Sequence, residues 1–196
     1  MKKTENKKDT HIPTWALNNF IRRWLGKPKR YNAAVRQGQV VADLGCGPGF
    51  YTFPLADRVG PTGKVYAVDS DENAIQAIVR KAAKGNYQNI ETHACSAGNL
   101  DFIDNESIDF VLGDGLLCCV APHAHADTVK EIIRILKPGA RAYLVTSRGS
   151  ISYVSDAEWE EILKEYQVES RNIPPYKGDR WAWVSKRSFT VAQAKK

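Results

Sequence analysis

A buried acid and a run of glycines are the residues of this sequence whose types and spacing could do chemistry. Asp43 is the fourth residue of the strand-like run VVADL (40–44), and the loop Gly45–Gly49, whose sequence is GCGPG, follows directly. Three glycines in five positions exceed what a tight turn between a strand and a helix needs. Such a loop lets a ligand lie directly against the backbone, and the helix behind it offers unpaired N–H groups. The sequence therefore predicts a ligand-binding loop directly after a buried strand.

The spacing of the glycines, together with two acids near the loop, narrows the choice of ligand. The dinucleotide fingerprint is GxGxxG, whereas this loop reads GxGxG, and the phosphate-binding pattern GxxxxGK[ST] is absent. Asp43 would repel a pyrophosphate but suits a ligand with an ammonium group. Asp69 lies 20 residues after Gly49, where a carboxylate can accept hydrogen bonds from both hydroxyls of a ribose. A ligand with a ribose, no phosphates and a positive amine is S-adenosylmethionine (SAM).

Several motifs of the chain are similar to those of a known family. The string DLGCGPG (43–49), with VYAVD (65–69) downstream, resembles the first motif and the following acidic motif of class I SAM-dependent methyltransferases. The resemblance continues through IDFVLGDG (108–115) and EIIRILKPGA (131–140), and covers roughly residues 38–147. It is closest to the small-molecule branch that includes methyltransferases of ubiquinone and menaquinone biosynthesis.

The resemblance implies where the parts of SAM are held. The carboxylate of Asp43 and the backbone of the glycine loop would hold the methionine part, which assigns to the cofactor Gly45, Cys46, Gly47 and Gly49. Asp69 would hold the ribose, and Ser70 would lie beside the adenine.

The segment after the expected third strand departs from the family pattern. The family usually has an acid in a D-A-x-x-L string there, whereas this chain has Ser96 and Ala97 at the start of SAGNL. A serine hydroxyl can still accept a hydrogen bond from the adenine amine, with less charge assistance. Ser96 and Ala97 therefore stay in the expected cofactor site, and a plain loop residue is the alternative interpretation of Ser96.

The residues after the expected fourth strand are those that could meet a methyl acceptor. Methyl transfer from a sulfonium is an in-line displacement that depends on positioning, and a base is required only when the nucleophile is protonated. Asp114 could orient or deprotonate an acceptor hydroxyl, amine or thiol. The alternative is that Asp114 is a turn acid that caps the next helix.

Two pairs of metal-ligand residue types follow Asp114. Arsenite methyltransferases hold arsenic with thiols, but the further cysteines of that family are missing, and the apolar run around Cys118 and Cys119 favours packing. His123 and His125 have no third ligand at a metal-site spacing. We therefore expect no metal, and we expect the histidines to begin a helix, with a substrate contact left open.

An alternation of strands and helices must position these residues. Apolar runs predict strands at 40–44, 64–69, 89–94, 107–114 and 141–147, and helical spacing predicts helices at 50–58, 71–84, 124–136 and 155–166, with two late strands near 166–171 and 181–187. Strands that are apolar on both faces and separated by helices predict a parallel sheet covered on both sides. The predicted fold is α/β: a Rossmann-like, doubly wound, seven-stranded sheet, mostly parallel with one antiparallel late strand, and helices on both faces.

Composition predicts one domain with an N-terminal extension. The chain has 196 residues and a net charge of +6, but residues 1–36 carry ten Lys/Arg against two Asp/Glu. We assign 1–36 to a basic tail and an amphipathic lid helix at 14–25, and 37–196 to the SAM-dependent methyltransferase domain. No apolar stretch is long enough for a membrane span, the N-terminus lacks the apolar core of a secretory signal, and four cysteines show no CxxC spacing. These features predict a cytoplasmic protein with reduced thiols.

The leading functional hypothesis is a SAM-dependent methyltransferase that acts on a small molecule. One alternative is methylation of RNA or protein through the basic segment 1–36, which predicts strongly salt-dependent substrate binding. A second is a non-catalytic SAM-binding scaffold, and a dehydrogenase is disfavoured by the GxGxG spacing and by Asp43. The sequence leaves the acceptor and the oligomeric state open.

Overall fold

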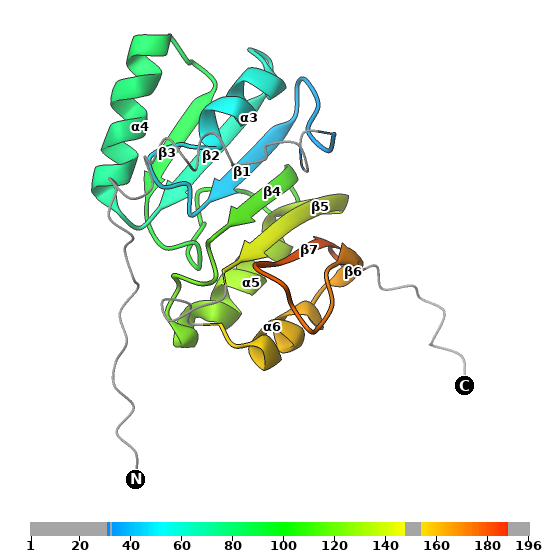
Figure 1. Ribbon diagram of the computed structural model, residues 1–196. Helices are drawn as coiled ribbons and strands as arrows, with labels where there is room; N and C mark the ends of the chain where they lie inside the picture. The colour runs from blue at the N-terminus through cyan, green and yellow to red at the C-terminus, as the bar shows by residue number, and fades with distance from the viewer. Residues whose placement is uncertain (1–30, 32, 148–153, 188–196) are drawn as a thin grey trace.

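The computed structural model describes residues 31, 33–147 and 154–187. The expected helix at 14–25 and most of the basic segment therefore lie outside the described residues. Figure 1 shows the elements in chain order, which are β1 (Val40–Leu44), α3 (Thr52–Val59), β2 (Lys64–Asp69), α4 (Glu72–Gly85), β3 (Ile90–Ala94), β4 (Ile108–Asp114), η1 (Pro122–Ala124), α5 (His125–Ile135), β5 (Leu136–Thr146), α6 (Asp156–Leu163), β6 (Gln167–Arg171) and β7 (Arg180–Ser185).

The strands form one seven-stranded sheet in the order β3-β2-β1-β4-β5-β7-β6. The pairs among β1 to β5 are parallel, and β7 is antiparallel to both β5 and β6. The predicted sheet, with its single antiparallel late strand, is confirmed. Because β1 lies between β2 and β4, the strand order reverses at β1, and the crevice outside the carboxyl ends of β1 and β4 is where such sheets bind ligands.

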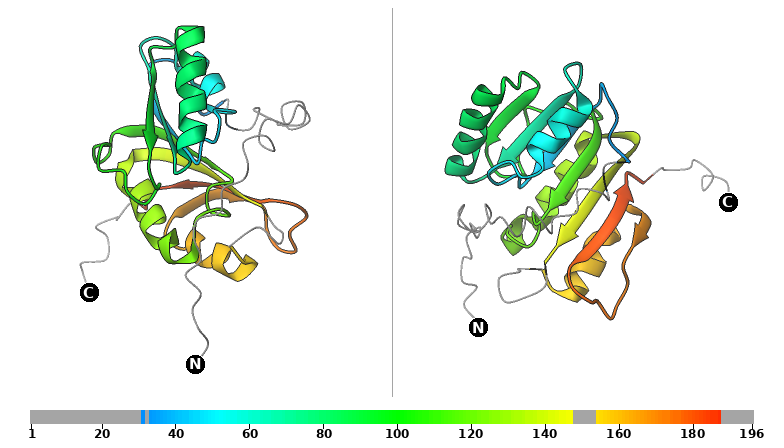
Figure 2. Two further views of the ribbon diagram at one scale, coloured as in Figure 1. Left: turned by 90° about the vertical axis from the view of Figure 1, so that its left-hand side faces the viewer. Right: turned by 45° about the horizontal axis from the view of Figure 1, so that its top comes forward.

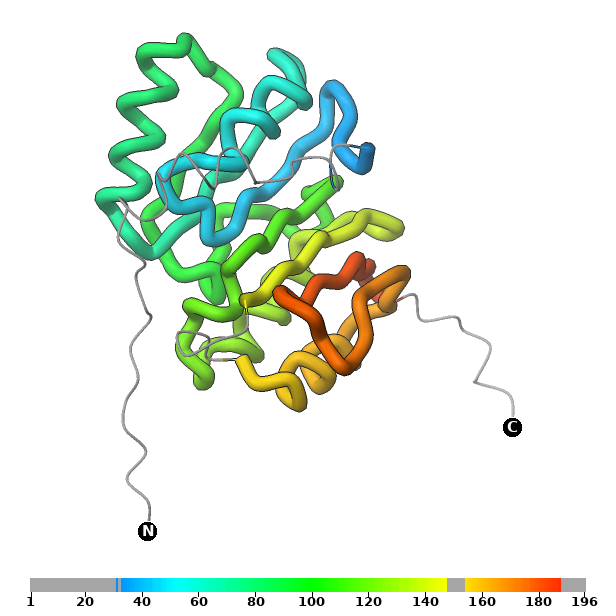
Figure 3. Tube along the Cα trace, viewed as in Figure 1, coloured from blue at the N-terminus to red at the C-terminus, as the bar shows by residue number. Residues whose placement is uncertain are grey.

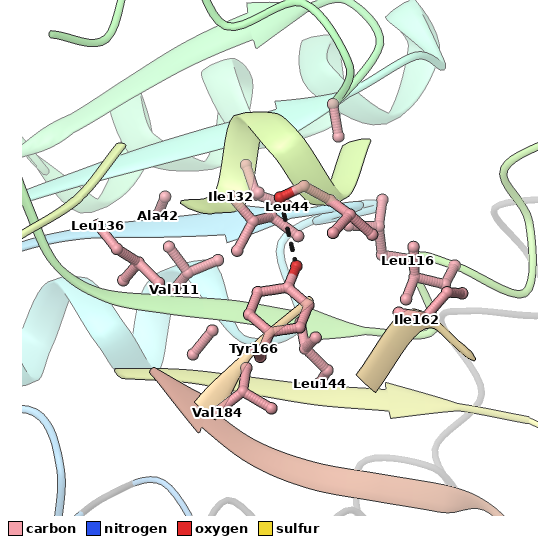
Figure 4. Close-up of a cluster of buried hydrophobic side chains, with 14 of the residues drawn as sticks. Ala42, Leu44, Val111, Leu116, Ile132, Leu136, Leu144, Ile162, Tyr166 and Val184 are labelled. Atoms are coloured by element: carbon pink, nitrogen blue, oxygen red, sulfur yellow. Dashed lines mark hydrogen bonds between the residues drawn. The ribbon is translucent and has the colours of Figure 1, made fainter. Parts of the chain in front are cut away.

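Helices cover both faces of the sheet (Figure 2). Alternate residues of each strand point to opposite faces, so the apolar side chains of both faces pack against helices. Val41 packs in one buried cluster with Leu55 of α3, and α4 continues this layer. The next residue, Ala42, belongs to a second cluster with Ile132 of α5 and Trp159 of α6. Figure 4 shows this second cluster, in which the Tyr166 hydroxyl donates to the carbonyl of Val129 at 3.4 Å.

The ends of several elements differ from the predicted ones. The Asp71 side chain caps α4 by accepting from the Asn73 amide at 2.9 Å, and the helix runs to Gly85, one residue beyond its predicted end at 84. The residue that follows, Asn86, is the C-cap: its φ of 54° is left-handed, and its amide donates to carbonyls of the last turn. β5 starts at 136 rather than 141, because Leu136 already pairs with Ile108 before a bulge shifts the register.

The two late strands, β6 and β7, form a hairpin at one edge of the sheet, which the Cα trace in Figure 3 shows next to β5. Residues 172–179, which include the sequence NIPPY, join β6 to β7, so this string is an inter-strand loop. Trp181 and Trp183 lie on one face of β7 and pack against the ring of Tyr143, with centroids 6.4 and 4.8 Å away. Trp183 also contacts the ring of Phe110, so both tryptophans pack on other aromatic rings of the sheet.

Candidate functional site

An open cleft lies outside the carboxyl ends of the strands, and its empty volume, open mouth included, is about 970 Å³. Its floor and walls come from the glycine loop and from the segments that follow β2, β3 and β4. Of the residues that the sequence assigns to a site, the cleft is lined by Gly45, Cys46, Gly47, Asp69, Ser70, Ser96, Ala97 and Asp114. Asp43 and Gly49 do not line it. Residues that sequence reasoning did not assign also line the cleft, among them Phe50, Tyr51, Cys95, Leu116, Cys119 and Val120.

The glycine loop is folded against the end of β2. Gly45, Gly47 and Gly49 have φ values of 73°, 52° and 87°, a left-handed backbone that glycine adopts without a steric cost. The amides of Gly45 and Cys46 both donate to the carbonyl of Val68, at 2.8 and 3.1 Å. This folding exposes the loop backbone to the cleft and leaves it no side chain larger than that of Pro48.

Asp69 ties the glycine loop to the turn after β2. One carboxylate oxygen accepts from the Gly47 amide and the other from the Asp71 amide, each at 2.8 Å. A carboxylate has about four acceptor positions, so two remain for a ligand in the cleft. The side chain is half-buried, which leaves those positions accessible to a ribose.

Asp43 lies beneath the loop rather than in the cleft wall. Its side chain is 2% exposed and accepts a hydrogen bond of 2.7 Å from the Thr52 hydroxyl at the start of α3. Burial raises the pKa of Asp43 from its ordinary value of 3.8 to about 7, against the opposing effect of the Thr52 bond, and the nearby Asp114 and Asp69 add to the rise. Asp43 is therefore a buried acid whose charge is sensitive to any cation that binds above it.

Replacing Gly49 with alanine is expected to destabilise the fold by about 3 kcal/mol or more. An alanine Cβ would lie 2.7 Å from the Phe53 ring and 3.0 Å from Ile78, inside contact distance, and φ is +87°. Left-handed backbone costs about 1–2 kcal/mol in a residue other than glycine, and overpacking adds about 1–3 kcal/mol. Gly139→Ala is the matched control, because φ there is +77° and nothing lies within 4 Å. Urea unfolding should give the control the backbone cost alone, and equal losses would contradict the packing argument.

The far end of the cleft is formed by the end of β4 and the turn behind it. Asp114 lines this end together with Gly115 and Leu116. The ring of Tyr31 stacks on Phe110 at 6.3 Å and meets the edge of Tyr51 at 5.5 Å. The Tyr31 hydroxyl is buried and has no hydrogen-bond partner among the described residues. Tyr31 does not line the cleft but supports Tyr51, which does.

The cysteine and histidine pairs have different surroundings. Cys119 lines the cleft, whereas Cys118 is buried and donates to the carbonyl of Gly115 at 3.1 Å. The four cysteines of the chain form no disulfide. His123 is exposed in η1, whereas His125 is buried at the first position of α5. Within 31, 33–147 and 154–187, no three or more His, Cys, Asp or Glu side chains are grouped to hold a metal ion.

The described helices, of which α4 is the longest, include none that is long and apolar enough to cross a membrane.

Known proteins match most of the chain. The family described as "Methyltransferase domain" matches residues 36–187. A demethylmenaquinone methyltransferase from Lactococcus lactis subsp. lactis is 30% identical over 167 residues, which are 81% of this chain and 62% of that protein. An arsenite methyltransferase from Halobacterium salinarum is 36% identical over 118 residues, which are 59% of this chain and 29% of that protein. The chain thus spans less than two thirds of the length of these relatives.

A solved structure shows the same fold. A SAM-dependent methyltransferase from Aquifex aeolicus superposes with a TM-score of 0.70 at 23% identity, over 87% of this chain and 96% of that one. The family match runs through every strand of the sheet and through the whole cleft. The chain therefore belongs to the methyltransferase-domain family of class I SAM-dependent methyltransferases.

Proposed function

We propose that the chain transfers a methyl group from SAM to a small-molecule acceptor. The observation that carries the proposal is one continuous cleft that runs from the glycine loop and Asp69 at one end to Asp114 at the other. The first end offers bare backbone and a carboxylate, which suit the amino-acid and ribose parts of SAM. The second end offers an acid, a thiol and apolar side chains, which suit a small organic acceptor.

The residues of the cleft fit SAM part by part. The two free acceptor positions of Asp69 would take the ribose hydroxyls, and the loop backbone at Gly45 and Gly47 would take the methionine part. The Ser96 hydroxyl oxygen accepts from the Gly98 amide at 3.2 Å and keeps a lone pair for the adenine amine. Asp43 would act from beneath the loop, as a charge that favours the bound cation.

The chemistry divides between cofactor and protein. SAM supplies an activated methyl group, and the protein supplies position and the exclusion of water. Tyr51, Leu116 and Val120 are apolar parts of the cleft lining and would exclude water from a bound acceptor. Asp114 would orient the acceptor and take its proton where the accepting atom carries one.

The chemical class of the methyl acceptor is the most specific part of the proposal. The two curated relatives are named for demethylmenaquinone and for arsenite, which are both small molecules. Methylation of RNA or protein depends on the basic segment 1–36, of which only residues 31 and 33–36 are described. A non-catalytic scaffold would bind SAM without turnover, so binding and transfer are measured separately.

The test is calorimetric titration of the full chain with SAM, with NAD as the control ligand. We expect micromolar binding of SAM and no binding of NAD. A screen with methyl-labelled SAM over phenols, quinols, thiols and amines then identifies the acceptor. Absence of SAM binding would overturn the proposal, and SAM binding without transfer to any acceptor class would favour the scaffold.

Replacing Asp114 with asparagine is expected to lower methyl transfer to a protonated acceptor by about 100-fold. Asparagine keeps the size and a hydrogen-bonding oxygen but cannot take a proton. SAM binding should change by less than about threefold, because Asp114 lies at the acceptor end of the cleft. Single-turnover rates on the acceptor found in the screen measure the effect, and an unchanged rate would remove Asp114 from the proton transfer.

A further inference from the structure

We propose that a proton held between His125 and Glu158 fastens the cleft wall formed by residues 115–120, so that cofactor affinity depends on this proton. The dependence on cofactor rests on the proposed function, whereas the fastening of the wall does not. His125 is a positioning residue in this proposal, since it acts through the wall and does not line the cleft.

The partners of the His125 ring require an extra proton. Its Nε2 lies 2.9 Å from the carbonyl oxygen of Val120 and 3.1 Å from that of Leu117, and its Nδ1 lies 2.7 Å from Glu158 Oε1. Carbonyl oxygens only accept, so Nε2 must carry a hydrogen. Nδ1 then either carries a hydrogen too, or accepts one from a protonated Glu158. In both arrangements one proton lies between Nδ1 and the carboxyl group.

The anchored carbonyls belong to the wall of the cleft. Gly115, Leu116, Cys119 and Val120 line the cleft, and the turn that they form follows β4. Within the turn, the amides of Cys119 and Val120 donate to the carbonyl of Leu116 at 3.0 and 3.2 Å. The His125 ring joins this turn, from inside the protein, to Glu158 on α6.

Loss of the shared proton would loosen the wall. A neutral His125 that keeps its hydrogen on Nε2 would turn a lone pair of Nδ1 toward the ionised Glu158 at 2.7 Å. Two acceptors at that distance repel each other, so the ring would shift and the bonds to the wall would lengthen. The His125 side chain is 6% exposed, whereas that of Glu158 is 33% exposed, so solvent reaches the pair on the Glu158 side.

The surrounding charges leave Glu158 as the partner of the ring. On α6, Asp156 is paired with the buried Arg180 of β7 at 3.1 Å. On α5, Asp127 is exposed in the first turn, and His123 precedes it in η1. In the wall itself, the buried thiol of Cys118 donates to Gly115. Hydrogen bonding, first of all with Cys119, lowers the pKa of this Cys118 thiol to about 6, so the wall holds a second group whose charge depends on pH. All these groups are common to the variants below, which are therefore compared with one another at the same pH.

Three substitutions distinguish the effect of the shared proton from the effect of the side chains themselves. Glu158→Gln supplies a permanent N–H to Nδ1 of a neutral His125, so the hydrogen bonds of His125 to the wall should persist without the shared proton. His125→Gln cannot donate to both sides, so the wall should be loose at every pH. Glu161→Gln is the matched control, because Glu161 lies on the same helix, is 70% exposed and pairs with Lys164. Thermal unfolding by circular dichroism first confirms that each variant is folded.

Amide hydrogen exchange of Cys119 and Val120, without SAM, tests the fastening of the wall. Protection of the two amides in the wild type should fall about five- to tenfold, relative to Glu158→Gln at the same pH, as the pH is raised and the shared proton is lost. The control should follow the wild type, and His125→Gln should be unprotected throughout. Equal protection in wild type and Glu158→Gln over the whole range would overturn the proposal.

Calorimetry with SAM over the same pH range tests the link to cofactor. The dissociation constant of the wild type should rise by the same factor relative to that of Glu158→Gln. A wall that loosens with pH in a protein that never binds SAM would overturn the proposed function but would support the fastening of the wall by the shared proton. Equal SAM affinities at every pH, despite a loosened wall, would overturn the dependence of cofactor affinity on the proton.

Discussion

Replacing Asp69 with alanine is expected to weaken SAM binding by about 100-fold or more. The carboxylate holds the glycine loop through the Gly47 amide and the following turn through the Asp71 amide, each at 2.8 Å. In the proposed complex it also accepts from the ribose. Hydrogen bonds to a charged group contribute about 1.5–3 kcal/mol each, so losing two of them costs about 3 kcal/mol or more. Each 1.4 kcal/mol is a tenfold change in the dissociation constant.

The control for Asp69→Ala is Asp57→Ala. Asp57 is an exposed aspartate of α3 that accepts from the Tyr87 hydroxyl at 2.8 Å, so its loss removes the same charge and a hydrogen bond outside the cleft. Calorimetry should give Asp57→Ala the wild-type affinity for SAM. Wild-type affinity in Asp69→Ala would show that the ribose is held elsewhere, and equal losses in both variants would show a general effect of charge.

Replacing Asp43 with asparagine is expected to stabilise the SAM-free protein above neutral pH while it weakens cofactor binding. Folding raises the pKa of Asp43 from 3.8 to about 7, so the folded state holds the proton more tightly than the unfolded state. Near pH 4 the folded state is protonated and the unfolded state is only about half ionised, so the penalty is small. As pH rises toward 7, burial of the charge costs increasing free energy, up to about 4 kcal/mol for a shift of about three units. Asparagine carries no such penalty and can still accept from Thr52.

Urea unfolding at about pH 4.5 and about pH 8 measures this effect. The advantage of Asp43→Asn over the wild type should be small at the lower pH and reach a few kcal/mol at the higher one. The affinity of the wild type for the cationic SAM should improve as pH rises through 7, because the bound cation favours the ionised acid, and the variant should lack this improvement. A variant less stable than the wild type at pH 8 would contradict a buried charge at Asp43.

Much of the fold follows from local patterns in the sequence. The apolar runs that end at Asp43, Asp69 and Asp114 give strands β1, β2 and β4 to within one residue of the predicted bounds. The ends that were predicted wrongly depend on contacts distant in sequence or on backbone angles. β5 begins early because Leu136 pairs with Ile108, and α4 includes Gly85 as its last residue because the left-handed cap is at Asn86.

The site likewise contains residues that the sequence predicts and contacts that it does not. The loop around Gly47 and the acid Asp69 can be found from sequence, because a motif and a rule about strand ends bring them to one edge of the sheet. The bond between Asp43 and Thr52 depends on side-chain directions across the first turn of α3. The contact of His125 with Glu158 joins residues 33 positions apart, and no spacing in the sequence signals it.

The reversal of strand order at β1 gives the chain a modular layout. The proposed cofactor side, from β1 through Ala97, is continuous in sequence, and the proposed acceptor side begins only at Asp114. On the proposed function, exchanging the segment after β4 between relatives would change the acceptor preference, provided that residues 115–120 keep the wall on which cofactor affinity is proposed to depend. Gly45 sets one limit on such exchange, because a Cβ there would lie 3.2 Å from the Leu116 side chain. Gly45 must therefore stay glycine wherever the transplanted segment keeps a side chain as close as that of Leu116.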